Sequence, residues 1–284
     1  MWHSDSLAIT TVNRCFWRVK SELSSRDYKA GVARAFVQAK LQQGIASFSL
    51  VDICRETGLS GMAGVRQLQR MGSQIAKVPR KAFFLIVSPE HQTMGAPPAS
   101  WWLDDYFRWL KHPYYVALQS AAALHGSEPQ AIQMTQVMTN HPQKELAVGR
   151  LRIRCFLKQS AERTPTQMQA RSRAPLKIST PAATILDLLR YAPRIGGLSR
   201  AWETGFRLLP QVSTETLLDA LDAANETALG QRLGYLLEEK NHPLTRVVEK
   251  WLSTSPPWAL LGVGIPARSG PRIEKWRLIK NSDL

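Results

Sequence analysis

The apolar positions between residues 48 and 71 predict two short helices joined by a glycine turn. Ser49 and Asp52 have the spacing of a capping box, which places a helix start at Leu50. Gly58 follows where a left-handed residue can end that helix and turn the chain. The second helix is predicted to carry its cap and its inward-facing positions at Ser60, Met62, Val65, Leu68 and Met71.

A longer helix before this pair and a hairpin after it complete the pattern. The apolar positions from Tyr28 to Ala39 recur at helical spacing and predict a helix that closes a small core. Residues 75–78 and 82–87 have the composition of strands, and the connection over residues 79–81 is basic. These elements predict a winged helix-turn-helix over residues 27–90, which makes DNA the first partner to consider.

Polar and cationic side chains on the second helix of the pair and on the hairpin are the candidate DNA contacts. Arginine can bind guanine edges in the major groove and glutamine can bind adenine edges, whereas cations on a wing reach phosphates. The candidates are Ser60, Arg66, Gln67, Gln69 and Arg70 on the helix and Lys77, Arg80 and Lys81 on the hairpin. The alternative is a structural or protein-binding winged helix, because any amphipathic helix pair with glycine at the joint gives a similar pattern.

The charge of the chain favours a polyanionic partner. The sequence has 37 Lys+Arg against 22 Asp+Glu, a net charge of +15, and such an excess attracts nucleic acid through counterion release. Residues 1–90 hold 13 basic and 6 acidic side chains, residues 91–180 hold 11 and 5, and residues 181–284 hold 13 and 11. We therefore expect the N-terminal part to bind DNA, the middle to extend the contact, and the last third to serve another task.

The length and one Pro/Gly-rich stretch predict two domains. A chain of 284 residues can form two cores, and proline and glycine interrupt the periodicity between residues 88 and 100. The predicted fold class is α+β. The predicted organisation is an N-terminal extension (1–26), the winged helix-turn-helix (27–90), a linker (91–100) and a larger mixed α/β domain (101–284).

The pattern of the second domain predicts helices around one long strand. Residues 114–125 are apolar or small on nearly every side and predict a buried helix that ends at Gly126. Residues 150–157 alternate with the period of a half-buried strand. Its predicted outer face bears Arg150, Arg152 and Arg154, about 6.6 Å apart, a spacing near that of successive phosphates. An ordinary solvated strand face explains the row equally well.

The remaining segments of the second domain have simpler patterns. Residues 159–177 are basic without apolar periodicity, so we expect a loop that is mobile until something acidic orders it. Thr180 and Pro181 have the order of a helix cap and first position, and helices are also predicted over residues 214–225 and 228–239. The tail over residues 258–281 is predicted to form two short strands separated by a Pro/Gly turn.

The sequence does not favour an enzyme. It contains no nucleophile elbow, P-loop, HExxH or dinucleotide fingerprint. Glu238 and Lys240 have the E-x-K spacing of metal-dependent nucleases, with Asp219 and Asp222 upstream, but we expect these side chains on solvent faces of helices, and a nuclease is the least favoured reading. We expect no catalytic residue. A DNA-binding regulator with a ligand-sensing second domain is the other alternative, although no sequence motif indicates a cofactor pocket.

The cysteines and the hydropathy of the chain indicate in which cellular compartment the protein is expected. The three cysteines are far apart and contain no CxxC, so neither a zinc site nor a disulfide framework is predicted, and we expect no metal or cofactor. No window is long and apolar enough to span a bilayer, and the first residues lack the regions of a secretory signal. We expect a cytoplasmic protein without a membrane partner.

Four short segments carry a family resemblance. They are HPYYVALQSAAALHG (112–126), STPAATILDLLRY (179–191), QRLGYLLEE (231–239) and PRIEKWRLIKN (271–281). In this order after a winged helix, the segments resemble the AbiEi family, the antitoxins of the AbiE abortive-infection systems. The likeness covers approximately residues 27–281. The segment before Asp27 and the basic loop of residues 159–177 depart from the family pattern.

The resemblance implies a bacterial type IV antitoxin of a toxin-antitoxin system used in phage defence. In that family the N-terminal winged helix represses its own operon by binding inverted repeats in the promoter. The C-terminal domain assists cooperative self-association on double-stranded DNA and neutralises a cognate nucleotidyltransferase toxin. Family members need not form a stable complex with that toxin.

Overall fold

The computed structural model describes residues 25–127, 134–169, 173–252, 255–265 and 269–282. The chain folds into two compact units, Met1–Pro97 and Pro98–Leu284, called here the N-terminal unit and the C-terminal unit. The predicted N-terminal extension lies almost entirely outside the described residues. Among the helices of the described ranges, none has the length and apolar character needed to cross a membrane.

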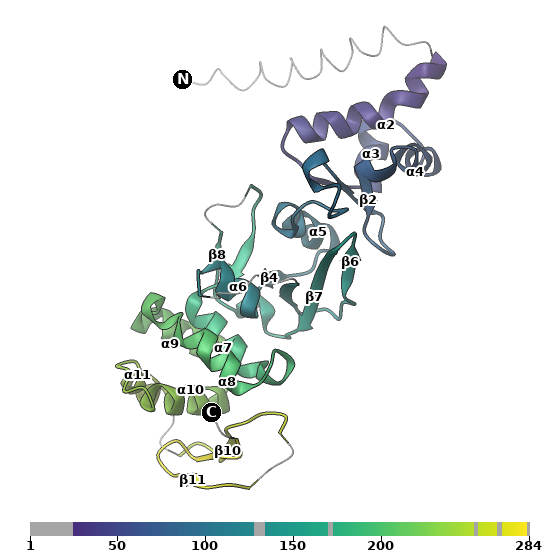
Figure 1. Cartoon of the computed structure of the whole chain (residues 1–284). Coiled ribbons are helices and arrows are strands. Elements are labelled where there is room, and N and C mark those ends of the chain that lie inside the picture. Colours follow the sequence, from purple (N-terminus) through teal and green to yellow (C-terminus); the bar gives the residue numbers. More distant parts are fainter. Residues whose placement is uncertain (1–24, 128–133, 170–172, 253–254, 266–268, 283–284) are drawn as a thin grey trace, which may run out of the picture. The chain divides into compact units, whose positions relative to one another are not determined.

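In its described residues, the N-terminal unit has three α-helices packed against a small sheet (Figure 1). Its elements in chain order are α2 (Ser25–Gln42), β1 (Ser47–Ser49), α3 (Leu50–Thr57), α4 (Gly61–Gln69), η1 (Gly72–Gln74), β2 (Ile75–Lys77), β3 (Phe83–Ile86) and η2 (Pro89–His91). The strand order is β1-β3-β2 and both pairings are antiparallel. Phe48 of β1 joins the helices to the sheet, because its ring contacts Phe36 edge-on and stacks on Phe84.

Local hydrogen bonds start and end α3 and α4 as the sequence predicts. The Ser49 hydroxyl accepts from the backbone N–H of Asp52 at 3.2 Å, and the Asp52 carboxylate accepts from the backbone N–H of Ser49 at 2.9 Å. Gly58 ends α3 with φ of +71°. The Ser60 hydroxyl then caps α4 by accepting from the N–H of Ala63 at 3.3 Å. The predicted capping box, glycine turn and second cap are confirmed.

The rotation of α4 about its axis differs from the prediction. Met62 was expected to face inward, but its side chain is 74% exposed. Leu68 and Met71 are buried as predicted, and Gly64 shares their side of α4, where an added Cβ atom would come within 3.6 Å of Leu50 in α3. Because residues two apart lie on nearly opposite sides of a helix, close packing at Gly64 turns Met62 outward.

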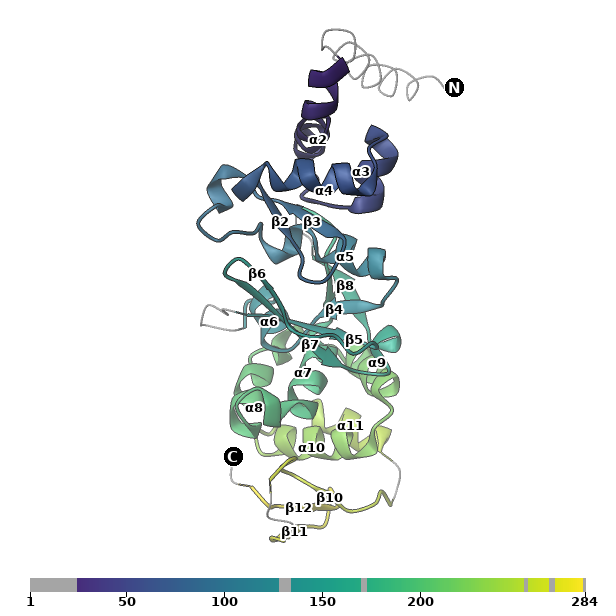
Figure 2. The ribbon, with the colours of Figure 1, turned by 90° about the vertical axis from the view of Figure 1, so that its right-hand side faces the viewer.

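A six-stranded mixed sheet forms the centre of the C-terminal unit (Figure 2). Its strands are β4 (Tyr114–Val116), β5 (Thr135–Thr139), β6 (Leu146–Val148), β7 (Leu151–Leu157), β8 (Thr166–Met168) and β9 (Lys177–Ser179), in the order β6-β7-β5-β4-β9-β8. The pairs β5–β7 and β4–β9 are parallel, and the other three are antiparallel. The α+β fold class is confirmed in this mixture of helices and sheets.

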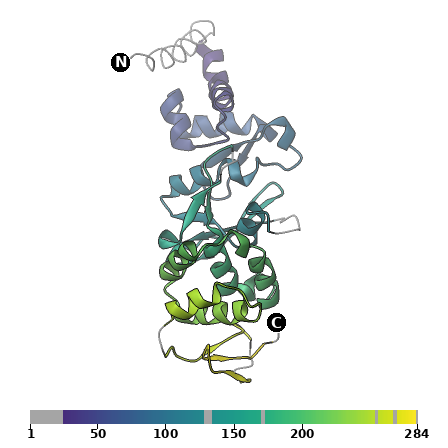
Figure 3. The ribbon, with the colours of Figure 1, turned by 90° about the vertical axis from the view of Figure 1, so that its left-hand side faces the viewer.

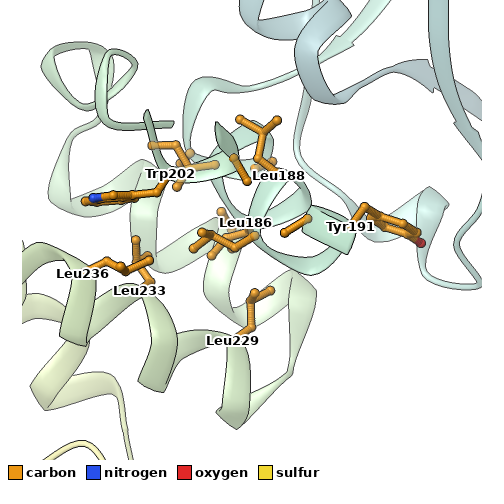
Figure 4. Packing of buried hydrophobic residues seen from close by; sticks show 14 of the residues in the cluster. Leu186, Leu188, Tyr191, Trp202, Leu229, Leu233 and Leu236 are labelled. Atoms are coloured by element: carbon orange, nitrogen blue, oxygen red, sulfur yellow. The ribbon is translucent and has the colours of Figure 1, made fainter. Parts of the chain in front are cut away.

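Helices account for most of the remaining C-terminal unit. They are η3 (Ala99–Trp101), α5 (Leu103–Leu110), α6 (Leu118–Leu124), η4 (Ala161–Arg163), α7 (Pro181–Arg190), η5 (Ala192–Arg194), α8 (Leu198–Phe206), η6 (Leu209–Gln211), α9 (Thr214–Ala224), α10 (Thr227–Glu238) and α11 (Thr245–Trp251). Figure 4 shows how α7 fills the centre: Leu186 and Leu188 pack with Trp202 of α8 and with Leu233 of α10. The helix α7 therefore joins the sheet to the helical layer.

Two adjacent tyrosines of β4 face opposite sides of the sheet. Tyr114 stacks on Phe107 of α5 with ring centroids 4.6 Å apart. Tyr115 points to the other face, where its hydroxyl reaches Asp187 of α7. The prediction of one helix over residues 114–125 was wrong for its first four residues, because Tyr114–Val116 pair as a strand with β5 and β9 and the helix α6 begins only at Leu118.

The basic segment 159–177 also has more structure than expected. Its described residues contain η4, the strand β8 and the first residue of β9, so the prediction of an irregular loop was wrong for them. Arg173 places its guanidinium over the ring of Trp101 at 4.2 Å. Arg171 lies outside the described residues.

The C-terminal tail forms a small sheet beside α10 (Figure 3). Where two strands were expected, the described residues contain three, β10 (Ala259–Leu260), β11 (Arg272–Ile273) and β12 (Leu278–Ile279), in the order β10-β12-β11. The helix α10 holds the tail through Trp276. The Gln231 amide donates to the Trp276 carbonyl at 2.9 Å, Glu238 accepts from the indole N–H, and a Cβ on Gly234 would lie 1.9 Å from the indole ring. The segments QRLGYLLEE and PRIEKWRLIKN are thus complementary parts of one contact.

Candidate nucleic-acid interface

The outward face of α4 carries four exposed side chains close together. With about 100° between successive residues of a helix, Met62, Arg66, Gln69 and Arg70 fall within an arc of about 100°. All four are exposed, whereas Gly64 and Leu68 on the opposite side are buried. This face therefore presents two guanidinium groups, one amide and one thioether to the outside.

The cations of α4 and of the hairpin differ from those beside them in having no carboxylate partner. Arg55 of α3 pairs with Asp52 at 2.9 Å, and Lys40 of α2 pairs with Glu56 at 2.9 Å. In the described part of the N-terminal unit, no carboxylate pairs with the cations of α4 and of the β2–β3 hairpin, namely Arg66, Arg70, Lys77, Arg80 and Lys81. Unpaired cations of this kind are available to phosphates and base edges.

The tip of the hairpin holds an arginine in an unfavourable backbone conformation. The Lys81 N–H donates to the Val78 carbonyl at 3.1 Å, which closes a turn with Pro79 in its second position and Arg80 in its third. Arg80 has φ of +60°, a left-handed value that turns normally assign to glycine or asparagine. A non-glycine residue kept in such a conformation favours a functional reason for its side chain.

Two of the helix candidates have structural roles, of which the sequence predicted only the capping role of Ser60. The Gln67 amide oxygen accepts from the backbone N–H of Ala33 in α2 at 3.0 Å, and the side chain is half-buried. Gln67 therefore lies off the face shared by Arg66 and Arg70 and connects α4 to α2, which differs from the expected position at a base edge. Ser60 uses its hydroxyl oxygen as the α4 cap.

The arginine row of β7 is less regular than expected. Arg152 folds back and donates to the carbonyls of Gly149 and Leu151, at 2.9 and 3.0 Å, while Arg154 lies over the ring of Phe156 at 5.2 Å. Phe156, on the same side of the strand, is buried against Tyr191. The side of the strand that bears the arginines is therefore buried at Phe156, because the segment after α7 covers it there. Arg150 lies before the strand and is exposed.

The C-terminal unit contains a buried ionic cluster that was not found in the sequence. Lys158 and Asp187 are 5% and 1% exposed, and their charged atoms are 2.6 Å apart. The Lys158 ammonium also donates to the Tyr115 hydroxyl at 3.1 Å, and that hydroxyl donates to Asp187 at 2.8 Å. Burial, followed by the nearby Asp187 charge, raises the pKa of Tyr115 well above its ordinary value, so the phenol stays protonated. The sequence contained one sign of this cluster: Asp187 is the only charged residue in the apolar segment TILDLL (184–189) of a predicted buried helix face.

An open hollow of about 620 Å³ borders this cluster at Lys158. It is lined in part by Lys158, Arg163, Arg190 and Glu226. Two of its cations are already paired, Lys158 with Asp187 and Arg190 with Glu226 at 2.5 Å. The hollow therefore offers little unpaired charge to a small ligand, and a ligand-sensing role gains no support from it.

Two of the carboxylates considered for nuclease chemistry are bound by neighbouring side chains. Glu238 is bound by Lys275 and by the indole of Trp276, and Asp222 accepts from the indole N–H of Trp251 at 2.6 Å. Over the residues with described positions, no group of three or more His, Cys, Asp or Glu side chains could hold a metal ion. His125 donates to the Ser179 carbonyl at 2.8 Å, and burial lowers its pKa.

One solved structure is similar to most of the chain, whereas a family model matches only part of the C-terminal unit. The crystal structure of the RV2827C protein from Mycobacterium tuberculosis is similar with a TM-score of 0.58 and 17% identity, over 87% of this chain and 90% of that chain. At this identity the likeness concerns the fold alone. No curated protein gave a significant match.

A family model matches the C-terminal unit. Residues 114–239 match the AbiEi antitoxin C-terminal domain, from the start of β4 to just past α10. This range contains the buried cluster of Tyr115, Lys158 and Asp187. The resemblance seen in the sequence is therefore confirmed for residues 114–239, which are similar to the AbiEi antitoxin C-terminal domain.

Proposed function

We propose that this protein is a non-enzymatic antitoxin that also represses its own operon. Its N-terminal unit binds inverted repeats in its promoter, and its C-terminal unit neutralises a cognate nucleotidyltransferase toxin. One observation carries the proposal: the cations of α4 and the β2–β3 hairpin have no carboxylate partner among the described residues, in a chain whose residues 114–239 match an antitoxin domain.

The order of elements in the N-terminal unit supports a winged helix-turn-helix. The helices α3 and α4 are separated by the turn at Gly58, and the β2–β3 hairpin follows them as a wing would. In this arrangement α4 enters the major groove, with Arg66, Gln69 and Arg70 at base edges. The wing cations Lys77, Arg80 and Lys81 contact phosphates. Gln67 is left out of this assignment because its amide oxygen binds Ala33.

Two molecules are needed for the two halves of an inverted repeat. The C-terminal unit assists this pairing on DNA, and its exposed Arg150 and Arg154 add phosphate contacts. The same unit neutralises the toxin without catalysing a reaction. A stable complex with the toxin is not required by this proposal, which follows the resemblance to the AbiEi family.

Binding to promoter DNA tests the repressor half. The purified full-length chain is titrated with its own promoter fragment and with a scrambled fragment, at about 50 mM and about 200 mM salt. Three wing phosphates per molecule predict a slope of log affinity against log salt of roughly −3 per molecule, steeper if other contacts add to it. Equal affinity for both fragments would leave only a basic surface and would contradict the assignment of α4 to base edges.

Toxin rescue tests the antitoxin half separately. The toxin encoded beside this gene is expressed with the full-length chain under an unrelated promoter, so that repression of the native operon plays no part. The chain with Arg66→Ala and Arg70→Ala should still protect the cells, because these side chains lie on the N-terminal unit. If this variant folds normally but loses protection, neutralisation does not reside in the C-terminal unit.

A further inference from the structure

One apolar side chain stands on the face of α4 that we assign to DNA. Met62 is 74% exposed, the largest exposed fraction among the exposed large hydrophobic side chains of the described residues. Single exposed apolar residues are common on protein surfaces, so exposure alone assigns no role. Met62 differs because it shares the outward arc of α4 with Arg66, Gln69 and Arg70.

The packing of α4 holds Met62 in this place. Gly64, two residues further along, lies against Leu50 and Ile53 of α3, where a Cβ would come within 3.6 and 3.8 Å of their side chains. Rotating Met62 towards the core would take Gly64 and Leu68 away from α3 and would expose Leu68, which is 2% exposed. The outward position of Met62 is therefore fixed by the helix as a whole.

The chemistry of the side chain restricts what it can recognise. Methionine ends in a thioether methyl group, has no hydrogen-bond donor, and adapts its shape through three rotatable bonds. In the major groove the base edges present donors and acceptors, and their one apolar group is the C5-methyl of thymine. Contact with any other edge would desolvate a polar group without replacing its hydrogen bond.

We propose that Met62 contacts the C5-methyl group of a thymine in the operator and so selects thymine over cytosine at one base pair of each half-site. This inference rests on the proposed binding of promoter DNA by α4. Arg66 lies one helical turn further, about 6 Å along the axis. Base pairs are about 3.4 Å apart, so this thymine lies within about two base pairs of the base contacted by Arg66.

A thymine-to-uracil scan tests the contact directly, because uracil lacks only the methyl group. Each thymine of the promoter fragment is replaced singly, and the affinity of the full-length protein is measured. At one position per half-site, affinity should fall about fourfold, which corresponds to about 0.8 kcal/mol for one buried methyl group. Met62→Ala removes the contact from both half-sites, so affinity for the thymine fragment should fall by about the square of that factor, roughly sixteenfold, and uracil at either position should cause no further loss.

Two further variants separate this role from general effects. Met62→Leu keeps an apolar side chain of similar size and should keep most of the thymine preference. Met94→Ala makes the same change as Met62→Ala at another exposed methionine of the N-terminal unit, in the turn after η2, and should leave the uracil pattern unchanged. Alanine is a strong helix former, so Met62→Ala should also retain the thermal midpoint of the native protein.

The outcomes distinguish this inference from the function on which it rests. If the native protein does not prefer its promoter to scrambled DNA, the proposed function fails and the thymine contact fails with it. If it prefers its promoter but no uracil effect depends on Met62, the contact alone is overturned. A change of oligomeric state in Met62→Ala, measured by sedimentation without DNA and with uracil sensitivity retained, would show instead that Met62 contacts protein.

Discussion

The two units of this protein use positive charge in different ways. On α4 and the β2–β3 hairpin the cations are mostly exposed, and they have no carboxylate partner in the described N-terminal unit. In the C-terminal unit Lys158 is buried and bound to Asp187, and Lys275 contacts both Glu238 and Glu249. A count of charges along the sequence treats these cations as equal.

The difference indicates which cations serve the fold and which are available to a partner. A buried charge must be paired, since leaving water carries a desolvation penalty that only close partners offset. Lys158 therefore connects β7 and β4 to α7 through Asp187 and Tyr115. The hydrated cations of α4 and the hairpin carry no such penalty, and phosphates can bind them by releasing counterions.

The largest effect is expected where the buried pair is broken. Asp187→Ala leaves Lys158 buried without its counterion and should lower the free energy of unfolding of the C-terminal unit by about 3–5 kcal/mol. Denaturant titration followed by tryptophan fluorescence measures this, because all tryptophans except Trp2 and Trp17 belong to that unit.

The matched control removes both charges together. Lys158→Met with Asp187→Leu replaces the pair by apolar side chains and should restore most of the lost stability, with the Tyr115 hydroxyl still 3.3 Å from Thr164. If Asp187→Ala proved as stable as the native protein, the pair would not be what joins the sheet to α7.

A smaller effect, on DNA binding alone, is expected at α4. Arg70→Ala should weaken binding to the promoter by roughly 1–3 kcal/mol and relax the preference at one base pair, with unchanged thermal stability. Competition binding with promoter fragments altered one base pair at a time measures both. Arg55→Ala, which removes a cation already paired with Asp52, is the matched control and should change affinity little. An equal loss on specific and random DNA from Arg70→Ala would contradict base readout.

The capping box of α3 should contribute about 1 kcal/mol to the free energy of unfolding of the N-terminal unit. Burial by itself raises the pKa of Asp52. Hydrogen bonds from the hydroxyl and the N–H of Ser49, together with the charges of Arg55 and Lys40, outweigh this effect, so the pKa lies below its ordinary value of 3.8. A depressed pKa stabilises the folded state above the unfolded pKa, and this contribution is lost as pH falls through the folded pKa.

Ser49→Ala removes one of these hydrogen bonds. It should lower stability by about 1 kcal/mol at neutral pH and should reduce the further loss in acid. Thermal unfolding followed by circular dichroism, from neutral pH to about pH 3, measures both. The Ser213→Ala variant, at the capping box of α9, is a matched change in the other unit. If both variants gave the same acid profile, Asp52 would not be the group responsible.

The smallest effect on stability is expected at the tip of the hairpin. Arg80→Gly places a residue that tolerates φ of +60° in the turn, so stability should stay equal or rise by up to about 1 kcal/mol. DNA binding should nevertheless weaken alike on all sequences, and the salt slope should fall by about 0.9. Lys81→Ala should have the same effect on binding without relief of the turn. Unchanged affinity for Arg80→Gly would exclude the hairpin as a wing.

The sequence determined the features that depend on neighbouring residues. The capping box of Ser49 and Asp52, the turn at Gly58 and the cap at Ser60 use hydrogen bonds between residues three or four apart, and all were predicted correctly. The strands β2 and β3 were predicted to within one residue at each end. Three of the four segments that resemble the AbiEi family lie within or overlap residues 114–239, the range that the family model matches.

Only the tertiary structure decided features that depend on distant partners. Contact of Gly64 with α3 and of Gln67 with Ala33 set the rotation of α4, which turned Met62 out and Gln67 in. Strand partners far along the sequence made Tyr114–Val116 a strand instead of a helix. The buried pair joins Lys158 and Asp187 across 29 residues. Local propensity and periodicity contain no information about such pairings, because the partner that fixes each one approaches only when the chain has folded.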